Sequence, residues 1–342
     1  MRPLLAAALL MAVWRAVGAG PYAAPAWLPG GHLQTLYAVA LPRPDVPYRR
    51  ERWELPDGDF IDLDWVDGPE DAPLVVLFHG LEGSSNSHYA RSLMAAVNRR
   101  GWRGVVPHFR GCSGEPNRLP RAYHAGDTPE IAYILGRLRD GNGHAPMYAA
   151  GVSLGGNALL KWLGDAGDQA RPVVDRVAAI SAPVDMVAAG RALDRGFTRT
   201  YTARFLHSLK RKALAKLDDY PLLYDRRTVE GIDTIEGFDT EVTARLHGYR
   251  DALEYWKKTS SKPGLVNIRV PTLLINARND PFLPAAVLPS PSEVSDQVTL
   301  EFSEAGGHVG FVRGTFPGNL DWLPGRLLHF FADRSHTSAA AP

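Results

Sequence analysis

The sequence predicts an α/β fold, in which helices cover both faces of a mostly parallel sheet. The first observation is that strand-like apolar runs alternate with runs of helical periodicity along most of the 342-residue chain, as in parallel sheets covered on both sides. The second is the run PLVVLFHG, which is apolar almost throughout and ends in His-Gly, as expected of a buried central strand that enters a loop. Because these features extend over nearly the whole chain, we expect one large domain.

The elements follow one another in a regular order. A hairpin is expected around Asp57-Gly58, because alternating runs lie on both sides of this turn pair in ERWELPDGDFIDLDWV. The strands expected after it are PLVVLFHG, WRGVVPHFRG, MYAAGVS, VDRVAAISAPVD, IRVPTLLINARNDPF and QVTLEFSEAGGH. The helices expected between the earlier strands are YARSLMAAVNRRG, PEIAYILGRLRD and NALLKWLGD.

The pattern changes between about residues 186 and 262, where the chain becomes rich in Arg and Lys, helix-periodic and aromatic. Such a helical insertion between two strands is either surface elaboration or a lid over an active site, and we favour the lid. We therefore expect an apolar leader or extension over residues 1–20, a single domain over 21–335 that includes the lid, and a frayed tail over 336–342.

Composition and charge argue against a nucleic-acid partner. The chain is 45% hydrophobic and 22% charged, close to the averages of globular proteins with a sizeable core. Its 38 basic and 37 acidic side chains produce no bulk field that would attract nucleic acid, so we expect no nucleic-acid partner. The single cysteine, Cys112, cannot form an internal disulfide, which fits a reducing compartment. We expect a cytoplasmic location.

The first twenty residues leave three interpretations open. An apolar run extends from Leu4 to Trp14 after a basic start, as in a weak signal peptide, so export is an alternative to the cytoplasm. Arg15 ends the run well short of the roughly 20 residues that a membrane-spanning helix needs. The segment could equally be an N-terminal helix that contacts a lipid surface, or an extension that the fold does not use.

The stretch GVSLG, from Gly151 to Gly155, has the spacing G-x-S-x-G of a nucleophile elbow. In this motif a sharp turn from strand to helix exposes a serine, here Ser153, at the edge of the sheet. Glycine is needed where the backbone approaches another segment closely, which explains why Gly151 and Gly155 interrupt good secondary structure. A chance match is the alternative, but a strand precedes the motif and a helix follows it.

A serine hydroxyl becomes a strong nucleophile when a histidine base, held by a carboxylate, takes its proton. Two later strands end in residues suitable for these roles. Asp280 follows one strand and His308 follows the next, so the order Ser153, Asp280, His308 is that of an elbow hydrolase. The simpler interpretations are an Asx turn for Asp280 and a loop histidine for His308. Asp185, which follows an earlier strand, is the alternative acid, while His329 in a helical run is a poorer candidate than His308.

Backbone amides complete the expected site. The residue after the serine, Leu154, and a residue in the loop after an early strand, Leu81, are placed to form an oxyanion hole. We interpret His79 as a structural residue that orients this loop. No metal-ligand spacing and no phosphate-binding loop is present, so we expect neither a metal nor another cofactor.

Taken together, these segments resemble the α/β-hydrolase fold and, within it, the YheT-like hydrolases that are related to the eukaryotic ABHD1/ABHD3 proteins. The resemblance covers Pro25 to Asp333. It depends on WLPGGHLQTLY, FHGLEGSSNSHYARSL, PHFRGCSGEPNR, YHAGDT, GVSLGGNALLKW, INARNDPF and GGHVGF. It implies an esterase with a triad of Ser153, Asp280 and His308 that acts on short- to medium-chain acyl esters, with lipid or phospholipid substrates in the eukaryotic relatives.

Three functions remain possible at this point. We favour a serine esterase that binds a small-molecule or lipid ester. Peripheral membrane contact is a further possibility for such an enzyme. An acyltransferase would use the same triad with an alcohol in place of water. A non-catalytic binding protein of the same fold would show a damaged triad, whereas all three positions here are intact.

Overall fold

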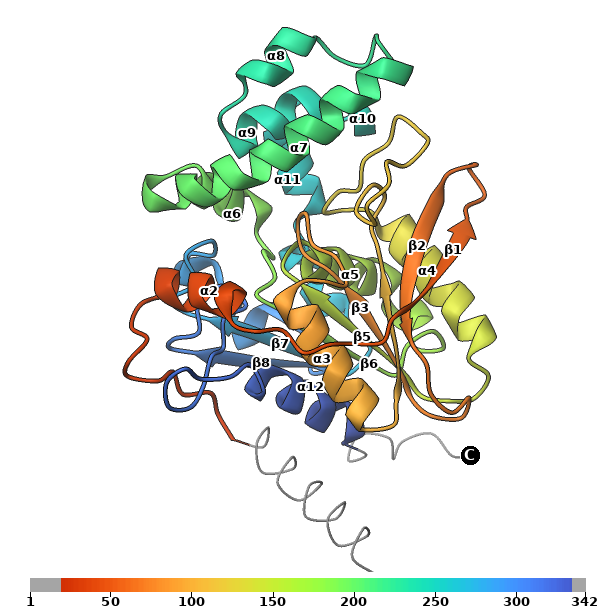
Figure 1. Cartoon of the computed structure of the whole chain (residues 1–342), viewed down its shortest axis with the longest axis vertical. Coiled ribbons are helices and arrows are strands. Elements are labelled where there is room, and N and C mark those ends of the chain that lie inside the picture. Colours follow the sequence, from red (N-terminus) through yellow and green to blue (C-terminus); the bar gives the residue numbers. More distant parts are fainter. Residues whose placement is uncertain (1–19, 334–342) are drawn as a thin grey trace, which may run out of the picture.

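The computed structural model describes residues 20–333. Within this range the strands form one eight-stranded sheet in the order β1-β2-β4-β3-β5-β6-β7-β8 (Figure 1). The first two strands form an antiparallel hairpin, β2 pairs antiparallel with β4, and all later neighbours are parallel. The predicted mostly parallel sheet is therefore confirmed. The strands are β1 (Arg49–Glu54), β2 (Phe60–Val66), β3 (Leu74–Phe78), β4 (Arg103–Pro107), β5 (Met147–Val152), β6 (Arg176–Ile180), β7 (Thr272–Ala277) and β8 (Val298–Ser303).

Helices cover both faces of the sheet because successive strand residues point to opposite sides. In β3, Leu74 and Val76 pack with the buried side chains of α4 (Thr128–Gly141) and α5 (Leu154–Ala166). Val75 and Leu77 pack instead with those of α3 (His88–Arg99) and α12 (Trp322–Ala332). Continuous apolar strands are the consequence of this two-sided burial, and every residue of β3, β5, β6 and β7 is buried.

One helix is not anticipated by the strand and helix pattern. It is α2 (Gly31–Ala40), which precedes the hairpin and packs beside the turns that follow β7 and β8. Its run GHLQTLYAVA is short and mostly apolar, so periodicity alone does not distinguish it from a loop or a buried strand.

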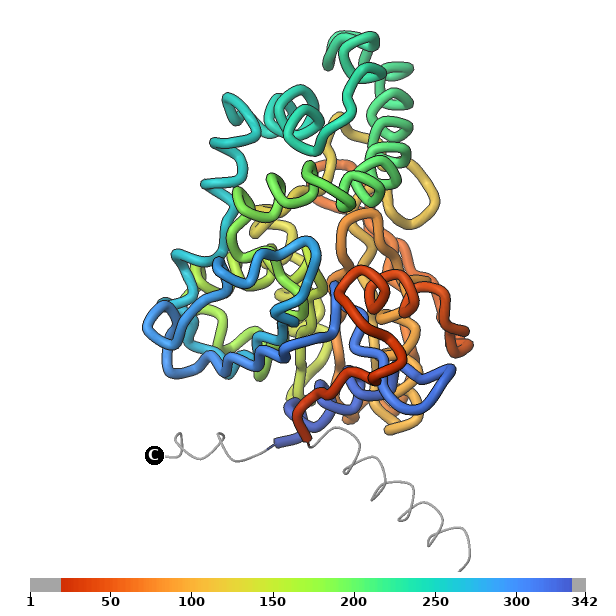
Figure 2. Tube along the Cα trace, turned by 90° about the vertical axis from the view of Figure 1, so that its left-hand side faces the viewer, coloured from red at the N-terminus to blue at the C-terminus, as the bar shows by residue number. Residues whose placement is uncertain are grey.

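Between β6 and β7 the chain forms a separate helical layer above the carboxyl ends of the strands (Figures 1 and 2). The two ends of this insertion are tied together, since the amide of Lys262 donates to the carbonyl of Val184 at 3.0 Å and the amide of Met186 donates to Ser260 Oγ at 2.9 Å. Its α-helices are α6 (Met186–Leu193), α7 (Arg199–Asp219), α8 (Arg226–Gly231), α9 (Ile235–Phe238), α10 (Arg245–His247) and α11 (Ala252–Thr259).

The predicted leader and tail cannot be located in this structure. Residues 1–19 and 334–342 lie outside the described range. The apolar run and the whole of the expected tail are among these residues. Among residues 20–333, no helix combines the length and the apolar character that crossing a membrane requires.

Candidate active site

Three strand ends bring the predicted catalytic side chains to one edge of the sheet. Ser153 follows β5, Asp280 lies three residues beyond β7, and His308 lies in the loop after β8. These strands are parallel and β5, β6, β7 and β8 are successive neighbours. Their carboxyl ends therefore open on the same side, where open α/β sheets place their sites.

Ser153 occupies a strained turn between β5 and α5. Its backbone has φ 53° and ψ −122°, a region that residues other than glycine rarely adopt. The turn is held from its neighbours, because the amide of Ser153 donates to the carbonyl of Ile180 at 2.8 Å and its carbonyl accepts from the amide of Asn157 at 3.0 Å. The strain thus places the hydroxyl at the apex of the turn.

The two elbow glycines make this turn possible. A methyl group on Gly151 would lie 2.6 Å from the carbonyl oxygen of Gly155, and a methyl group on Gly155 would lie 2.7 Å from that of Phe78. Both contacts are with backbone, which cannot move aside as a flexible side chain could. The glycines therefore allow β3, β5 and the start of α5 to approach closely around Ser153.

A continuous chain of hydrogen bonds joins the three side chains. His308 Nε2 lies 3.0 Å from Ser153 Oγ, and His308 Nδ1 lies 2.8 Å from Asp280 Oδ2. The other carboxylate oxygen of Asp280 accepts from the amide of Phe282 at 2.8 Å, and the carboxylate is fully buried. With its proton on Nδ1 facing the carboxylate, the imidazole presents a free lone pair on Nε2 to the serine hydroxyl.

The competing acid and histidines have other positions. Asp185 caps the N-terminus of α6, where its side chain accepts from the amide of Ala188 at 3.0 Å, as expected of a turn or hinge residue. His329 lies in α12, in the layer below the sheet (Figure 1). The geometry thus brings Asp280 and His308 to Ser153, and uses Asp185 as a helix cap.

The two residues expected to supply oxyanion amides both lie close to Ser153. Leu154 is the first residue of α5, so its N–H is one of the four that the helix leaves without an intrahelical acceptor. Leu81 lies in the loop after β3, next to Gly80, on which a methyl group would lie 3.1 Å from Ser153 Cβ. The amide of Gly80 donates to Tyr89 Oη at 2.9 Å. This loop therefore lies directly against the candidate nucleophile.

His79 supports that loop as a neutral side chain. Its Nδ1 donates to the carbonyl of Gly80 at 2.8 Å and its Nε2 accepts from the amide of Phe109 at 3.1 Å. Burial lowers the pKa of His79 to about 3, so that the imidazole stays uncharged and keeps one donor and one acceptor. These contacts support the structural interpretation of this residue. Within residues 20–333, no cluster of three or more His, Cys, Asp or Glu side chains is arranged to hold a metal ion.

Comparison with known proteins decides the family. The family model described as the alpha/beta hydrolase fold matches residues 73–315. The chain belongs to the α/β-hydrolase family. It is 44% identical over 303 residues to the protein named "Putative esterase YheT" of Escherichia coli, with 86% of this chain and 88% of that protein covered. It is 30% identical over 298 residues to the protein named "Phospholipase ABHD3" of mouse, with 82% and 70% covered.

Solved structures agree on the fold of this α/β hydrolase. The esterase Pf2001 of Pyrococcus furiosus superimposes with a TM-score of 0.53, with 84% of this chain and 91% of that chain covered, at 16% sequence identity. At this identity the likeness concerns the fold alone.

The histidine loop of this α/β hydrolase is held by α2, a contribution that the sequence analysis missed. Thr35 Oγ1 accepts from the amide of His308 at 2.8 Å, and Gln34 Oε1 accepts from the amide of Gly306 at 2.8 Å and from Asn279 Nδ2 at 3.0 Å. One helix therefore positions the backbone that leads into His308 and the residue that precedes Asp280. The adjacent polar residues Gln34 and Thr35 in the mostly apolar run GHLQTLYAVA are the only sequence signal for this role.

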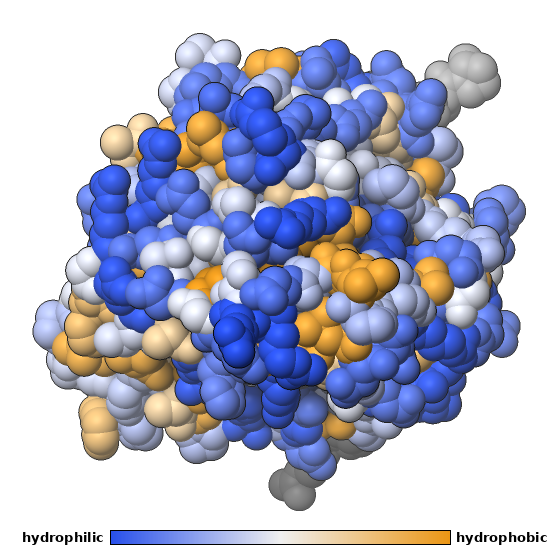
Figure 3. All heavy atoms as spheres, turned by 90° about the horizontal axis from the view of Figure 1, so that it is seen from above, coloured by the Kyte–Doolittle hydropathy of each residue, from blue (hydrophilic) through white to orange (hydrophobic). Residues whose placement is uncertain are grey.

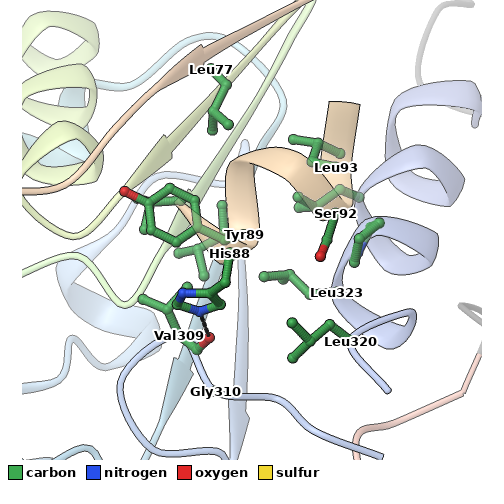
Figure 4. A pocket seen from close by; sticks show the side chains of 13 residues that line it. Leu77, His88, Tyr89, Ser92, Leu93, Val309, Gly310, Leu320 and Leu323 are labelled. Atoms are coloured by element: carbon green, nitrogen blue, oxygen red, sulfur yellow. Dashed lines mark hydrogen bonds between the residues drawn. The ribbon is translucent and has the colours of Figure 1, made fainter. Parts of the chain in front are cut away.

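The residue after the histidine is held in a strained conformation. Val309 has φ 56°, which is a genuine outlier for a β-branched side chain. His88 Nε2 donates to its carbonyl at 3.0 Å and Ser181 Oγ accepts from its amide at 3.1 Å. Burial lowers the pKa of His88 to about 4, so it is a neutral donor here. Figure 4 shows this contact beside an apolar cavity whose lining includes neither Ser153 nor His308.

Proposed function

We propose that this α/β hydrolase is a serine esterase that cleaves carboxylic esters of short- to medium-chain acyl groups, lipid esters among them. The observation that carries the proposal is the hydrogen-bonded chain from Asp280 through His308 to Ser153 at a strained elbow. This arrangement activates a hydroxyl that is otherwise a weak nucleophile.

Each residue has a distinct step in the proposed reaction. His308 Nε2 removes the proton of Ser153, whose Oγ attacks the ester carbonyl carbon, and Asp280 stabilises the resulting imidazolium. The amides of Leu81 and Leu154 donate to the oxyanion, and each such donor is worth about 3 to 4 kcal/mol of transition-state stabilisation. His308 then gives the proton to the leaving alcohol, and a water molecule repeats the sequence on the acyl-enzyme.

The surroundings of the triad favour an apolar acyl group. The ring of Phe282 lies 4.4 Å from that of His308, and the ring of Tyr201, on α7, lies 4.8 Å from that of Phe282. The face seen from above the insertion carries hydrophobic side chains near its centre, among hydrophilic ones (Figure 3). We interpret the insertion, residues 186–262, as a lid whose aromatic underside contributes to the acyl site.

The names of the relatives point to the same bond. One relative is named as a putative esterase and another as a phospholipase, and both names denote proteins that cleave ester bonds. The chain of hydrogen bonds from Asp280 to Ser153 suits acyl transfer from a carboxylic ester, and we therefore propose this ester as the bond that the chain cleaves.

A graded ester panel tests the proposal. We expect hydrolysis of p-nitrophenyl esters from acetate to decanoate, with an optimum at short to medium chains, and covalent labelling by a fluorophosphonate probe at Ser153 alone. The Ser153→Ala variant should lose both signals while keeping its melting temperature. Labelling that persists in this variant, or an intact protein that cleaves no ester and takes no label, would contradict a serine esterase. Addition of an alcohol acceptor distinguishes acyl transfer from hydrolysis by its product.

A further inference from the structure

One ion pair joins the insertion to the loop that carries the Leu81 amide. Lys212 on α7 lies with its Nζ 2.7 Å from Glu82 Oε1. The Glu82 side chain is only 10% exposed and that of Lys212 is 34% exposed, so the pair is partly withdrawn from water and less screened than a surface pair. Figure 1 shows α7 crossing above the carboxyl ends of the strands, the side on which this loop lies.

Glu82 is held in a conformation that it would not adopt without support. Its backbone has φ 53°, a left-handed value that is unfavourable for residues with a side chain. Tyr123 Oη accepts from the amide of Glu82 at 2.8 Å and donates to its Oε1 at 2.9 Å. The same carboxylate oxygen therefore receives both the tyrosine and Lys212.

These contacts fix the peptide that bears the proposed oxyanion donor. Leu81 lies between Gly80, whose amide donates to Tyr89 Oη at 2.9 Å, and Glu82. The amide of Gly83 closes the turn by donating to the carbonyl of Gly80 at 2.9 Å. Rotation of the Glu82 backbone would move the Leu81 carbonyl and distort the turn that orients the N–H of Leu81. Of the named partners of this turn, Lys212 is the one that comes from the insertion.

The surroundings of Lys212 favour its positive charge. Burial alone would lower the pKa of Lys212, but the neighbouring Cys112 and Glu82 outweigh it, so its pKa is raised. Burial raises the pKa of Tyr123 well above its ordinary value, which keeps it a neutral hydroxyl donor.

We propose that Lys212 is a positioning residue for the oxyanion hole, which takes its productive geometry only when α7 is seated on the Glu82 loop. The inference rests on the proposed esterase function and extends it, because it makes the insertion part of the machinery that stabilises the transition state. An oxyanion donor acts only when it is aimed at the place where charge develops, and small displacements are costly.

The test compares two lysines of the same helix. Lys216 lies four residues further along α7 and also anchors it to the body, through the carbonyl of Asn117, but it does not touch the Glu82 loop. We measure kcat, KM and melting temperature for Lys212→Met, Lys216→Met, Lys212→Arg and Glu82→Met, and for the double variant Lys212→Met with Glu82→Met. The substrate is an uncharged p-nitrophenyl ester, so that it offers no charged group that Lys212 could bind directly.

We expect Lys212→Met to lower kcat about 10- to 100-fold with KM within about twofold, below the 100- to 1,000-fold effect of losing a donor outright. Lys212→Arg should restore most of kcat, and Lys216→Met should stay within about twofold of the native enzyme. The double variant should be no slower than the slower single variant, because both remove one interaction.

Three results would overturn the inference while leaving the esterase intact. They are an unchanged kcat in Lys212→Met, an equal loss in Lys216→Met, and a change confined to KM. If Lys212→Met does not fold, Glu82→Met decides, because Met removes the oxygen that accepts from Lys212, and an unchanged kcat in that variant excludes the pair from catalysis. A native enzyme without Ser153-dependent hydrolysis would instead refute the esterase function itself, and the inference with it.

Discussion

Replacing Asp280 by Asn should abolish most activity without unfolding the protein. One oxygen of this buried side chain accepts from the amide of Phe282 at 2.8 Å and must remain an oxygen in the variant. The amide NH₂ then faces His308 Nδ1, where a carboxylate oxygen lay at 2.8 Å. A donor in that place forces the imidazole proton onto Nε2, which can no longer accept the proton of Ser153.

The expected loss in kcat is about 10⁴-fold, as in a comparable triad, or about 5.5 kcal/mol of barrier. Asp185→Asn is the matched control. Asn caps a helix as well as Asp does, so the bond to the amide of Ala188 is kept and stability changes by only a few tenths of a kcal/mol. Steady-state kinetics and thermal unfolding of both variants separate catalysis from folding. A folded, inactive Asp185→Asn enzyme beside an active Asp280→Asn enzyme would refute this assignment of the acid.

Three further outcomes are expected. The pKa of His88 falls from 6.5 in the unfolded chain to about 4 in the folded protein. Its stabilising effect is therefore complete above about pH 6.5 and declines as the pH falls toward 4. Between pH 7.5 and 5 the free energy of unfolding should drop by about 2 kcal/mol more in the native protein than in His88→Gln. Gly155→Ala should lower the free energy of unfolding by about 1 to 3 kcal/mol and remove activity, because its methyl group would lie 2.7 Å from the Phe78 carbonyl oxygen. In the control Gly136→Ala, in α4, the methyl group meets nothing within 4 Å, so this variant should be neutral or stabilising. Equal melting temperatures of the two variants would contradict this. A chain that starts at Gly20 should keep its esterase activity, and insoluble or inactive protein would show that residues 1–19 are needed.

The sheet could be predicted from the sequence because its strands are buried on both faces. The runs that become β3, β5, β6 and β7 are almost entirely apolar, and the helices between them have a regular apolar period. Ser153 could be placed because its glycines are required by backbone contacts that only the elbow produces. Asp280 and His308 could be placed because each follows a strand in the order that the elbow demands.

The partners that hold these residues could not be predicted in the same way. Gln34 and Thr35 act on His308 and Gly306 across more than 270 positions of the chain, and a contact over such a separation has no local periodicity. Lys212 likewise has the same sequence appearance as Lys216 on the same helix, although one contacts Glu82 and the other a carbonyl on a different loop. Their difference arises from the direction in which α7 crosses the sheet, which depends on packing between layers. A sequence pattern therefore identifies the candidate catalytic groups, while the side chains that contact and hold them become visible only when the layers are assembled.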